Sequence, residues 1–395
     1  MKVMILGGDG FCGWPTALHL SERGHRILIV DNFSRRRIDD ELGVQSLTPI
    51  KTLPERLSVW LEVSGKSISF TEIDVARQYE ALLAALKNFE PDAIIHFAEQ
   101  RAAPYSMKSP HHKRYTVSNN TEATHNLLAA IVESRLDAHL IHLGTMGVYG
   151  YTSDIKIPEG YLTVRYSDLS GEETSRDILF PADPGSVYHM TKTMDQLQFL
   201  FYNKNDGVRI TDLHQGIVWG TQTAETKLDE GLVNRFDYDG DYGTALNRFI
   251  VQAVVNHPLT VHGRGGQTRA FIHIQDSVKC IELALLNPPK ANERVRIFNQ
   301  ATEVFKINDL AKIVAEMTGA RIEHVPNPRN ELEENELHVD TGAFLELGLE
   351  PTCLRDDLLS EIMSVAIRFK DRVNTQSIPS TSKWLLDTEV LARPE

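Results

Sequence analysis

At 395 residues with 42% apolar side chains, the chain is long enough to fill two cores, as two domains or as one large domain with an appended lobe. Its 41 basic and 54 acidic residues give a formal net charge of −13, which argues against nonspecific binding to nucleic acid or anionic lipid. The three cysteines, Cys12, Cys280 and Cys353, form no CxxC pair, so neither a disulfide framework nor a zinc cluster is indicated. No apolar run approaches the ~18 residues of a membrane span and a strand begins at Lys2, so we expect a cytoplasmic protein without a targeting segment.

The first predicted strand leads directly into a glycine-rich turn. Apolar residues 3–6 are followed by Gly7, Gly10 and Gly13 and then by a helical pattern. Such glycines allow a tight turn, a close approach of backbone to a diphosphate and close packing of helix on strand. The second strand ends at Asp31, where a carboxylate can accept both hydroxyls of an adenosine ribose. The pattern predicts a dinucleotide site, and Asp31 favours NAD over NADP because it would repel a 2′-phosphate.

A basic run, residues 32–37, follows Asp31. Its Arg35 and Arg36 either contact the cofactor's phosphate or adenine or belong to a solvated loop, and the sequence leaves both open. The third strand ends at Asp74, a usual place for a carboxylate near the adenine amine.

Strands and helices alternate along the first half of the chain. This alternation predicts an α/β fold, a Rossmann-type doubly wound parallel sheet with a smaller C-terminal lobe. We expect residues 1–220 to form the NAD-binding domain and residues 221–395 to form mainly the substrate lobe, with an interleaved boundary. The predicted strands are 3–6, 26–30, 67–73, 93–98, 139–143 and 258–263, and the predicted helices are 16–23, 78–87, 115–134 and 244–256.

A catalytic set follows the predicted fifth strand. Tyr188 and Lys192 are four residues apart, so they share one face of a helix, and Thr145 stands at a strand end that can face them. Tyrosine titrates near pH ~10 and is a poor base unless its anion is stabilised, which Lys192 can do. Thr145 can hold a substrate hydroxyl whose proton goes to Tyr188 while hydride goes to the cofactor. We expect the neighbouring His189 to point elsewhere on the helix, as a packing residue or as a second proton donor.

Three arginines are candidate anion ligands. Arg101 lies in residues 99–106, after the carboxyl end of the strand 93–98, where open α/β sheets keep their ligand crevice. Arg269 and Arg329 lie in two loops of the second lobe and could clamp a diphosphate, or could be surface ion-pair partners.

The features so far resemble the extended short-chain dehydrogenases that act on nucleotide sugars. The resemblance rests on the glycine set, Asp31, Thr145, the pair Tyr188 and Lys192, and a lobe motif at 259–273. It implies that the second lobe binds a nucleotide sugar.

Four further blocks, residues 7–16, 99–107, 143–147 and 325–329, resemble the branch of that family that adds sulfite to UDP-glucose. The similarity runs nearly end to end and fades after about Asn374. It implies UDP-glucose and sulfite, or a sulfite donor protein, as partners, with NAD recycled in place. C4 would be oxidised, water would leave from C6, sulfite would add to the enone, and hydride would return to C4.

One catalytic pair of related enzymes is missing. Nucleotide-sugar 4,6-dehydratases carry Asp-Glu after the corresponding threonine, where this chain has Met146 and Gly147. His189, Arg101 or ordered water must then serve the elimination, and the sequence does not decide among them.

The site residues assigned in this way form two sets. The cofactor set is Gly7, Asp9, Gly10, Phe11, Cys12, Gly13, Asp31, Asn32, Arg35, Arg36, Asp74, Val75, Phe97, Ala98, Glu99, Asn119, Tyr188, Lys192 and Val218. The substrate set is Arg101, Tyr105, Thr145, Met146, His189, Gln215, Arg248, Thr260, Val261, Gln267, Arg269 and Arg329. We assign no metal ligand, and no nucleic acid or membrane partner.

Two other functions fit part of the pattern. A UDP-glucose 4-epimerase or 4,6-dehydratase would share the catalytic residues, but not the blocks at 99–107 and 145–147. A non-catalytic NAD-sensing module would not need the whole catalytic set. The resemblance also implies a homodimer in which helices 115–134 and 188–203 pair with their copies.

Overall fold

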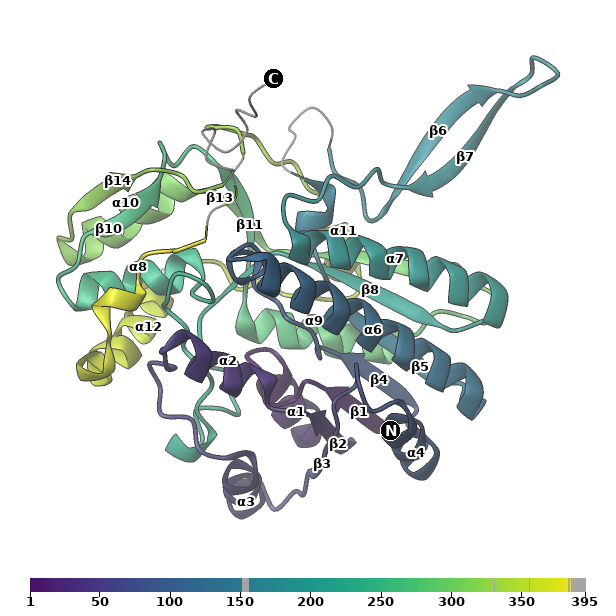
Figure 1. Ribbon diagram of the computed structural model, residues 1–395, viewed down its shortest axis with the longest axis horizontal. Coiled ribbons are helices and arrows are strands. Elements are labelled where there is room, and N and C mark those ends of the chain that lie inside the picture. Colours follow the sequence, from purple (N-terminus) through teal and green to yellow (C-terminus); the bar gives the residue numbers. More distant parts are fainter. Residues whose placement is uncertain (151–155, 330, 355, 383, 385–395) are drawn as a thin grey trace, which may run out of the picture.

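The computed structural model describes residues 1–150, 156–329, 331–354, 356–382 and 384. Its main body is a seven-stranded sheet in which all neighbouring strands are parallel (Figure 1). From edge to edge the strands are β12 (Arg296–Gln300), β8 (Ile210–Gln215), β5 (His139–Thr145), β4 (Ala93–His96), β1 (Lys2–Leu6), β2 (Arg26–Asp31) and β3 (Ser69–Glu72). The strand order reverses between β1 and β4, so the predicted doubly wound sheet is confirmed.

Two hydrophobic cores lie on opposite faces of this sheet. Successive strand residues point to opposite faces, so Val3 and Ile5 of β1 join one core, whereas Met4 and Leu6 join the other. Helices cover both faces (Figure 1). The first core includes residues of α1 (Gly13–Glu22), α3 (Leu53–Ser64), α9 (Ile274–Leu286) and α11 (Gly342–Glu346), and the second includes residues of α4 (Tyr79–Phe89), α6 (Pro110–Ser134) and α7 (Val187–Asp206).

A smaller lobe sits at the carboxyl ends of the strands and has its own core. Its strands are β10 (Leu259–His262), which pairs in parallel with β14 (Ile322–Val325), and β11 (Thr268–His273), which lies between β13 (Glu303–Lys306) and β9 (Ile217–Trp219). Its helices are α8 (Ala245–Val254), α10 (Ile307–Thr318) and α12 (Asp356–Arg368). Because β12 and α9 return to the large sheet after residue 220, the division at that residue stays a prediction.

The remaining elements are short or project from the body. They are α2 (Ser34–Leu42), α5 (Ala103–Ser106), η1 (Met146–Tyr149), η2 (Glu230–Leu232), η3 (Lys370–Arg372), η4 (Thr375–Ser377) and the hairpin of β6 (Tyr161–Ser167) and β7 (Glu173–Leu179). Figure 1 shows the hairpin extending away from the sheet. It is held at its base, where the Tyr161 hydroxyl donates to the Val295 carbonyl at 2.8 Å and Arg294 stacks on the Tyr161 ring. No helix in the described part of the chain is both long and apolar enough to cross a membrane.

Two helices begin earlier than predicted. Helix α6 starts at Pro110 rather than at residue 115, because Ser109 caps its N-terminus and proline suits the first helical turn. Helix α1 starts at Gly13, within the glycine motif itself, which brings its N-terminal amides to the turn.

Candidate active site

The glycine turn after β1 leaves no room for side chains. A Cβ on Gly13 would lie 2.1 Å from the Gly7 carbonyl oxygen, and one on Gly7 would lie 2.8 Å from the Phe97 backbone. Gly7 also has a φ of +83°, a conformation that side chains disfavour. The turn therefore forms a smooth wall at the N-terminus of α1, and it lines a cavity along the carboxyl ends of β1, β2 and β4. This cradle fits a dinucleotide diphosphate.

Most of the predicted cofactor set lines this cavity. Lining residues from that set are Gly7, Asp9, Gly10, Phe11, Cys12, Gly13, Asp31, Asn32, Arg35, Asp74, Val75, Phe97, Ala98, Glu99, Asn119, Tyr188 and Lys192. Two predicted members lie elsewhere. Val218 lines the adjoining cavity, and Arg36 is paired with the Asp9 carboxylate through Nε at 2.6 Å and Nη2 at 2.9 Å. The Asp9 pairing occupies Arg36, which agrees with NAD rather than a 2′-phosphorylated cofactor.

Asp31 is held by backbone amides at the cofactor cavity. Its oxygens accept from the Asp9 amide at 2.8 Å and from the Phe33 amide at 2.7 Å. Burial, with the Asp9 charge adding to it, raises the pKa of Asp31 to about 6. Its ionised form, with one lone pair still available on each oxygen, is an acceptor for ribose hydroxyls.

A second cavity adjoins the first and shares Phe11, Arg101 and Tyr188 with it. It is walled by both lobes and holds most of the predicted substrate set. Lining residues from that set are Arg101, Thr145, Met146, His189, Gln215, Arg248, Gln267, Arg269 and Arg329.

Three predicted substrate residues are placed elsewhere. Tyr105 is 2% exposed, packs in a cluster with Tyr242 and donates to Glu41 at 2.9 Å. Val261 is fully buried in the small-lobe core, and the Thr260 hydroxyl accepts from Gln252 at 2.7 Å. Strand alternation explains the placement of Val261, whose side chain faces the core with Leu259, whereas Thr260 lies on the other face and is bonded to Gln252.

The loop between β9 and α8 supplies site residues that the sequence did not single out. Asp237 accepts from Arg101 at 2.7 Å and from Arg35 at 3.2 Å, and Arg35 stacks 3.7 Å above the Tyr242 ring. The segment from Asp237 to Gly243 alternates acidic, aromatic and glycine residues, which was a usable signal for an ordered loop. Arg101 is thus already paired with a carboxylate, although it lines both cavities.

Thr145, Tyr188 and Lys192 meet where the two cavities join. Thr145 ends β5, and its hydroxyl accepts from the Gly147 amide at 3.1 Å. Tyr188 and Lys192 lie one turn apart on α7, as predicted. Burial raises the pKa of Tyr188 and the Glu99 charge adds to that effect, while Lys192, Arg101 and Thr145 work to lower it.

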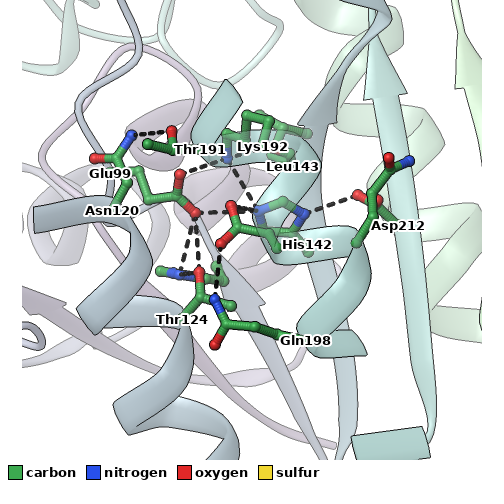
Figure 2. Close-up of polar contacts among 12 residues, drawn as sticks. Glu99, Asn120, Thr124, His142, Leu143, Thr191, Lys192, Gln198 and Asp212 are labelled. Atoms are coloured by element: carbon green, nitrogen blue, oxygen red, sulfur yellow. Dashed lines mark hydrogen bonds and ion pairs between the residues drawn. The ribbon is translucent and has the colours of Figure 1, made fainter. Parts of the chain in front are cut away.

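The Lys192 ammonium lies among the polar groups of Glu99, His142 and Leu143 (Figure 2). It lies 2.7 Å from the Leu143 carbonyl oxygen, 2.9 Å from Glu99 Oε2 and 3.0 Å from His142 Nε2. Burial works to lower the pKa of Lys192, but Glu99, Tyr188 and Asp195 raise it overall, so the charge persists.

His189 faces the substrate cavity, which corrects the expectation that it points elsewhere. Its ring lies 5.3 Å from the Tyr188 ring, and both line the same cavity. Burial lowers the pKa of His189 to about 3, helped by the charges of Arg329 and Arg269, so its imidazole is neutral.

Three of the predicted arginines, Arg248, Arg269 and Arg329, line the substrate cavity. Arg269 is ion-paired with Glu331, and Arg329 stacks 5.2 Å from the Trp384 ring. Arg248 Nε is buried without a hydrogen-bond partner among the described residues. Burial lowers the pKa of Arg248 to about 10, and Arg329 adds to that effect, so the guanidinium stays charged at neutral pH.

Comparison with known proteins agrees with the fold and the cofactor site. Residues 3–299 match the NAD dependent epimerase/dehydratase family. The chain belongs to this family, and its cofactor is NAD.

Two curated relatives narrow the comparison. The chain is 45% identical over 388 residues to the chloroplastic UDP-sulfoquinovose synthase of Spinacia oleracea, covering 97% of this chain and 79% of the relative. It is 39% identical over 356 residues to the UDP-sulfoquinovose synthase of Sulfolobus acidocaldarius, covering 89% and 88%.

Solved structures share the fold at lower identity. A UDP-glucose 4-epimerase of Thermotoga maritima, solved with UDP-glucose, superimposes with a TM-score of 0.68 at 19% identity, covering 94% of this chain and 99% of that one. A UDP-glucuronic acid 4-epimerase of Bacillus cereus, solved with UDP-glucuronic acid and NAD, gives 0.66 at 22% identity, covering 95% and 100%.

Proposed function

We propose that the protein is an enzyme that makes UDP-sulfoquinovose from UDP-glucose and sulfite. The observation that carries the proposal is the 45% identity over 97% of the chain to a UDP-sulfoquinovose synthase. The joined cavities support it, because Thr145, Tyr188 and Lys192 stand between a dinucleotide cradle and an arginine-rich pocket.

The chain's own residues supply proton transfer and positioning. When bound in the glycine-lined cavity, NAD would supply the acceptor for hydride from C4 of the sugar and the donor for its return. Thr145 holds the C4 hydroxyl, and Tyr188 takes its proton, because both hydroxyls lie at the junction of the cavities. Lys192 stabilises the Tyr188 anion through its charge.

His189 is our candidate for the water elimination. A neutral imidazole can accept the C5 proton, made acidic by the C4 carbonyl, and pass it to the departing C6 hydroxyl. The ring faces the cavity beside Met146 and Gly147, where related dehydratases carry their carboxylates. Hydroxide plus this proton leaves as water, so the elimination needs no external acid.

Arg248, Arg269 and Arg329 are proposed to bind the diphosphate of the nucleotide sugar. Guanidinium groups pair with phosphate oxygens in bidentate geometry, and the buried Nε of Arg248 still needs an acceptor. Arg101, nearer the nicotinamide side, is proposed to hold sulfite.

A homodimer is proposed through α6 and α7, which lie side by side (Figure 1). Leu197 and Phe201 of α7 are each 59% exposed, and an apolar pair on an outer helix suits an interface. Leu127, Leu128 and Phe199 are fully buried in the chain's own core and take no part in that argument.

Incubation of the NAD-loaded protein with UDP-glucose, with and without sulfite, tests the function. Mass spectrometry of the nucleotide sugar should show a sulfonated product only with sulfite. UDP-galactose would indicate an epimerase, and a 4-keto-6-deoxy sugar formed without sulfite would indicate a dehydratase. If the sugar is unchanged and NAD is not reduced, the remaining interpretation is a non-catalytic NAD-sensing module.

A further inference from the structure

A buried cluster of ionisable side chains lies beneath Lys192 (Figure 2). Glu99 follows the carboxyl end of β4, His142 stands on β5, Asp195 follows Lys192 by one helical turn, and Asp212 stands on β8. Their side chains are no more than 2% exposed. Burying so many ionisable groups costs free energy unless they are paired, so their pairing decides the charge that reaches the active site.

Three groups lie within 3.0 Å of the Lys192 ammonium nitrogen. They are the Leu143 carbonyl oxygen, Glu99 Oε2 and His142 Nε2, and the Tyr188 hydroxyl is not among them. Lys192 therefore acts on Tyr188 through its charge. Glu99, whose Oε2 lies 2.9 Å from the ammonium nitrogen, offsets that charge.

The cluster does not suit a metal ion. Glu99, His142 and Asp195 bring ligand atoms within 4.8 Å of one another, which is close enough to surround a cation. The Lys192 ammonium already contacts two of them and supplies that positive charge.

His142 ties Glu99 to the next strand. Its Nδ1 lies 2.8 Å from Asp212, and its Nε2 lies 3.1 Å from Glu99 Oε1. Nε2 can donate to Glu99 when the ring is protonated or accept from Lys192 when it is neutral, but not both. Burial and Lys192 work to lower the pKa of His142, whereas Asp212 and Glu99 outweigh them and raise it to about 9, so the bond to Glu99 prevails at neutral pH.

The two carboxyl groups near Lys192 have pKa values shifted in opposite directions. Burial works against ionised Glu99, but Lys192 and His142 hold its pKa well below the ordinary value. Burial and the Glu99 charge raise the pKa of Asp195 well above its ordinary value.

From this geometry we propose that Glu99 is a positioning residue that acts through Lys192. Its carboxylate offsets the ammonium charge, so the proton taken from the substrate stays on Tyr188 while the oxidised sugar loses water and gains sulfite. The inference rests on the proposed function. In the oxidation the O4–H bond breaks and its proton goes to Tyr188, while the C4 hydrogen leaves as hydride to the nicotinamide; the final reduction reverses both transfers.

The physical reason for such a role is that the sugar must stay oxidised at C4 through several steps. A 4-epimerase needs only a rotation of the sugar between its two hydride transfers, whereas this reaction places an elimination and an addition there. A phenol that gives up its proton less readily delays the return of hydride and so protects the intermediate. The titratable and charged groups that face Tyr188, Lys192 and Glu99 are His96 of β4, Arg101, His142 of β5, Asp195 of α7 and, behind His142, Asp212 of β8.

NMR titration of the NAD-loaded protein, labelled with ¹³C at the tyrosine ring carbon that bears the hydroxyl, tests the proposal. Tyr188→Phe identifies the resonance. Glu99→Gln should lower the pKa of Tyr188 by about 1 unit or more, because an offsetting charge is removed. Asp195→Asn is the matched control, and it should shift the resonance much less because Glu99, which lies 2.9 Å from the Lys192 ammonium, raises the Lys192 pKa more than Asp195 does. An unchanged pKa in Glu99→Gln, or a larger shift in Asp195→Asn, overturns the proposal.

A second readout follows hydride transfer before sulfite is added. The acidic limb of the rate of NADH formation from UDP-glucose should move to lower pH in Glu99→Gln by the same amount. If Glu99→Gln fails to fold, Glu99→Asp is the second variant, because it keeps the charge but moves it one methylene further from Lys192. The pKa of Tyr188 should then fall by a smaller amount. An unchanged Tyr188 pKa in Glu99→Asp overturns the proposal. Neither readout requires a sulfonated product, so a failure of the proposed function can be distinguished from a failure of the proposal about Glu99.

Discussion

The imidazole of His189 occupies the space that a side chain on Gly147 would need. A Cβ on Gly147 would lie 2.3 Å from His189 Cδ2 and 2.4 Å from His189 Nε2. Because Gly147 of η1 has no side chain, the His189 ring of α7 can reach the cavity wall. The position of the histidine therefore depends on the glycine.

Gly147→Ala should push the ring away and impair the elimination more than the oxidation. We expect product formation to fall by about 10²-fold, because a misplaced proton donor loses most of its effect. NADH absorbance should still rise with UDP-glucose. Gly342→Ala is the control, since its Cβ would meet only an ordinary contact at 3.4 Å. Normal product formation by Gly147→Ala would show that His189 need not stand there.

Tyr188→Phe and Lys192→Ala should reduce turnover by about 10²- to 10⁴-fold, because proton transfer belongs to the transition state. Binding of UDP-glucose, measured by calorimetry, should change little. Tyr202→Phe, further along α7 and bonded to His125, is the matched control and should keep full turnover. Wild-type turnover in either site variant would rule out the catalytic role.

Arg101→Ala should raise the sulfite concentration needed for half-maximal rate about tenfold, because a charge-assisted hydrogen bond is lost. The UDP-glucose requirement and the reduction of bound NAD should change far less. Initial rates over a sulfite series measure the effect, with Arg165→Ala on the exposed hairpin as control. An unchanged sulfite requirement would leave Arg101 as the structural partner of Asp237.

The stability of the protein should depend on pH through His19. Its ring nitrogens lie 2.8 Å from Glu225 and 2.8 Å from Glu282; burial works to lower the pKa of His19, but these two carboxylates raise it overall. A histidine with a raised pKa in the folded state stabilises fully below its unfolded value of about 6.5, and this contribution is lost as pH rises through the folded value.

His19→Gln should therefore lower the unfolding midpoint most below about pH 6.5 and progressively less at higher pH. Thermal unfolding followed by circular dichroism across that range measures the difference. His111→Gln, which replaces an exposed histidine, should give a pH-independent difference. If the difference in unfolding midpoint between the wild type and His19→Gln does not change with pH, a charged His19 is excluded.

Substitution of Leu197 and Phe201 by glutamate should convert a dimer to single chains, because two buried charges would oppose the apolar interface. Light scattering should give twice the chain mass for the wild type and the mass of one chain for the double variant. Leu228→Glu, at an equally exposed leucine of a distant loop, should leave the mass unchanged. A wild type with the mass of one chain would end the dimer proposal.

The sequence predicted the fold and the site best where a local pattern and the required chemistry agree. The strand, glycine turn and Asp31 were identifiable because backbone contact and ribose binding demand those residue types. The pair on α7 was identifiable from helical spacing. Their catalytic roles stay predictions.

Long-range contacts were beyond the sequence. Asp237 contacts Arg101, which is 136 positions away in the sequence, and His142 contacts Asp212, which is 70 positions away. No local sequence pattern predicts either contact. Thr260 and Val261 were assigned from a motif, whereas the alternation of β10 decides which side chains face the cavity. The hairpin of residues 161–179 was missed because its strands are exposed, and their side chains follow no core-facing alternation.

The edge strand β12 comes from residues 296–300, after β9, α8, β10 and β11 of the small lobe. As the chain is synthesised, the sheet exposes the backbone edge of β8 until these residues emerge from the ribosome. Co-translational folding of the large sheet therefore cannot finish before the first half of the small lobe is made. A gene fragment ending at residue 220 would encode a sheet whose β8 edge is open and prone to aggregation.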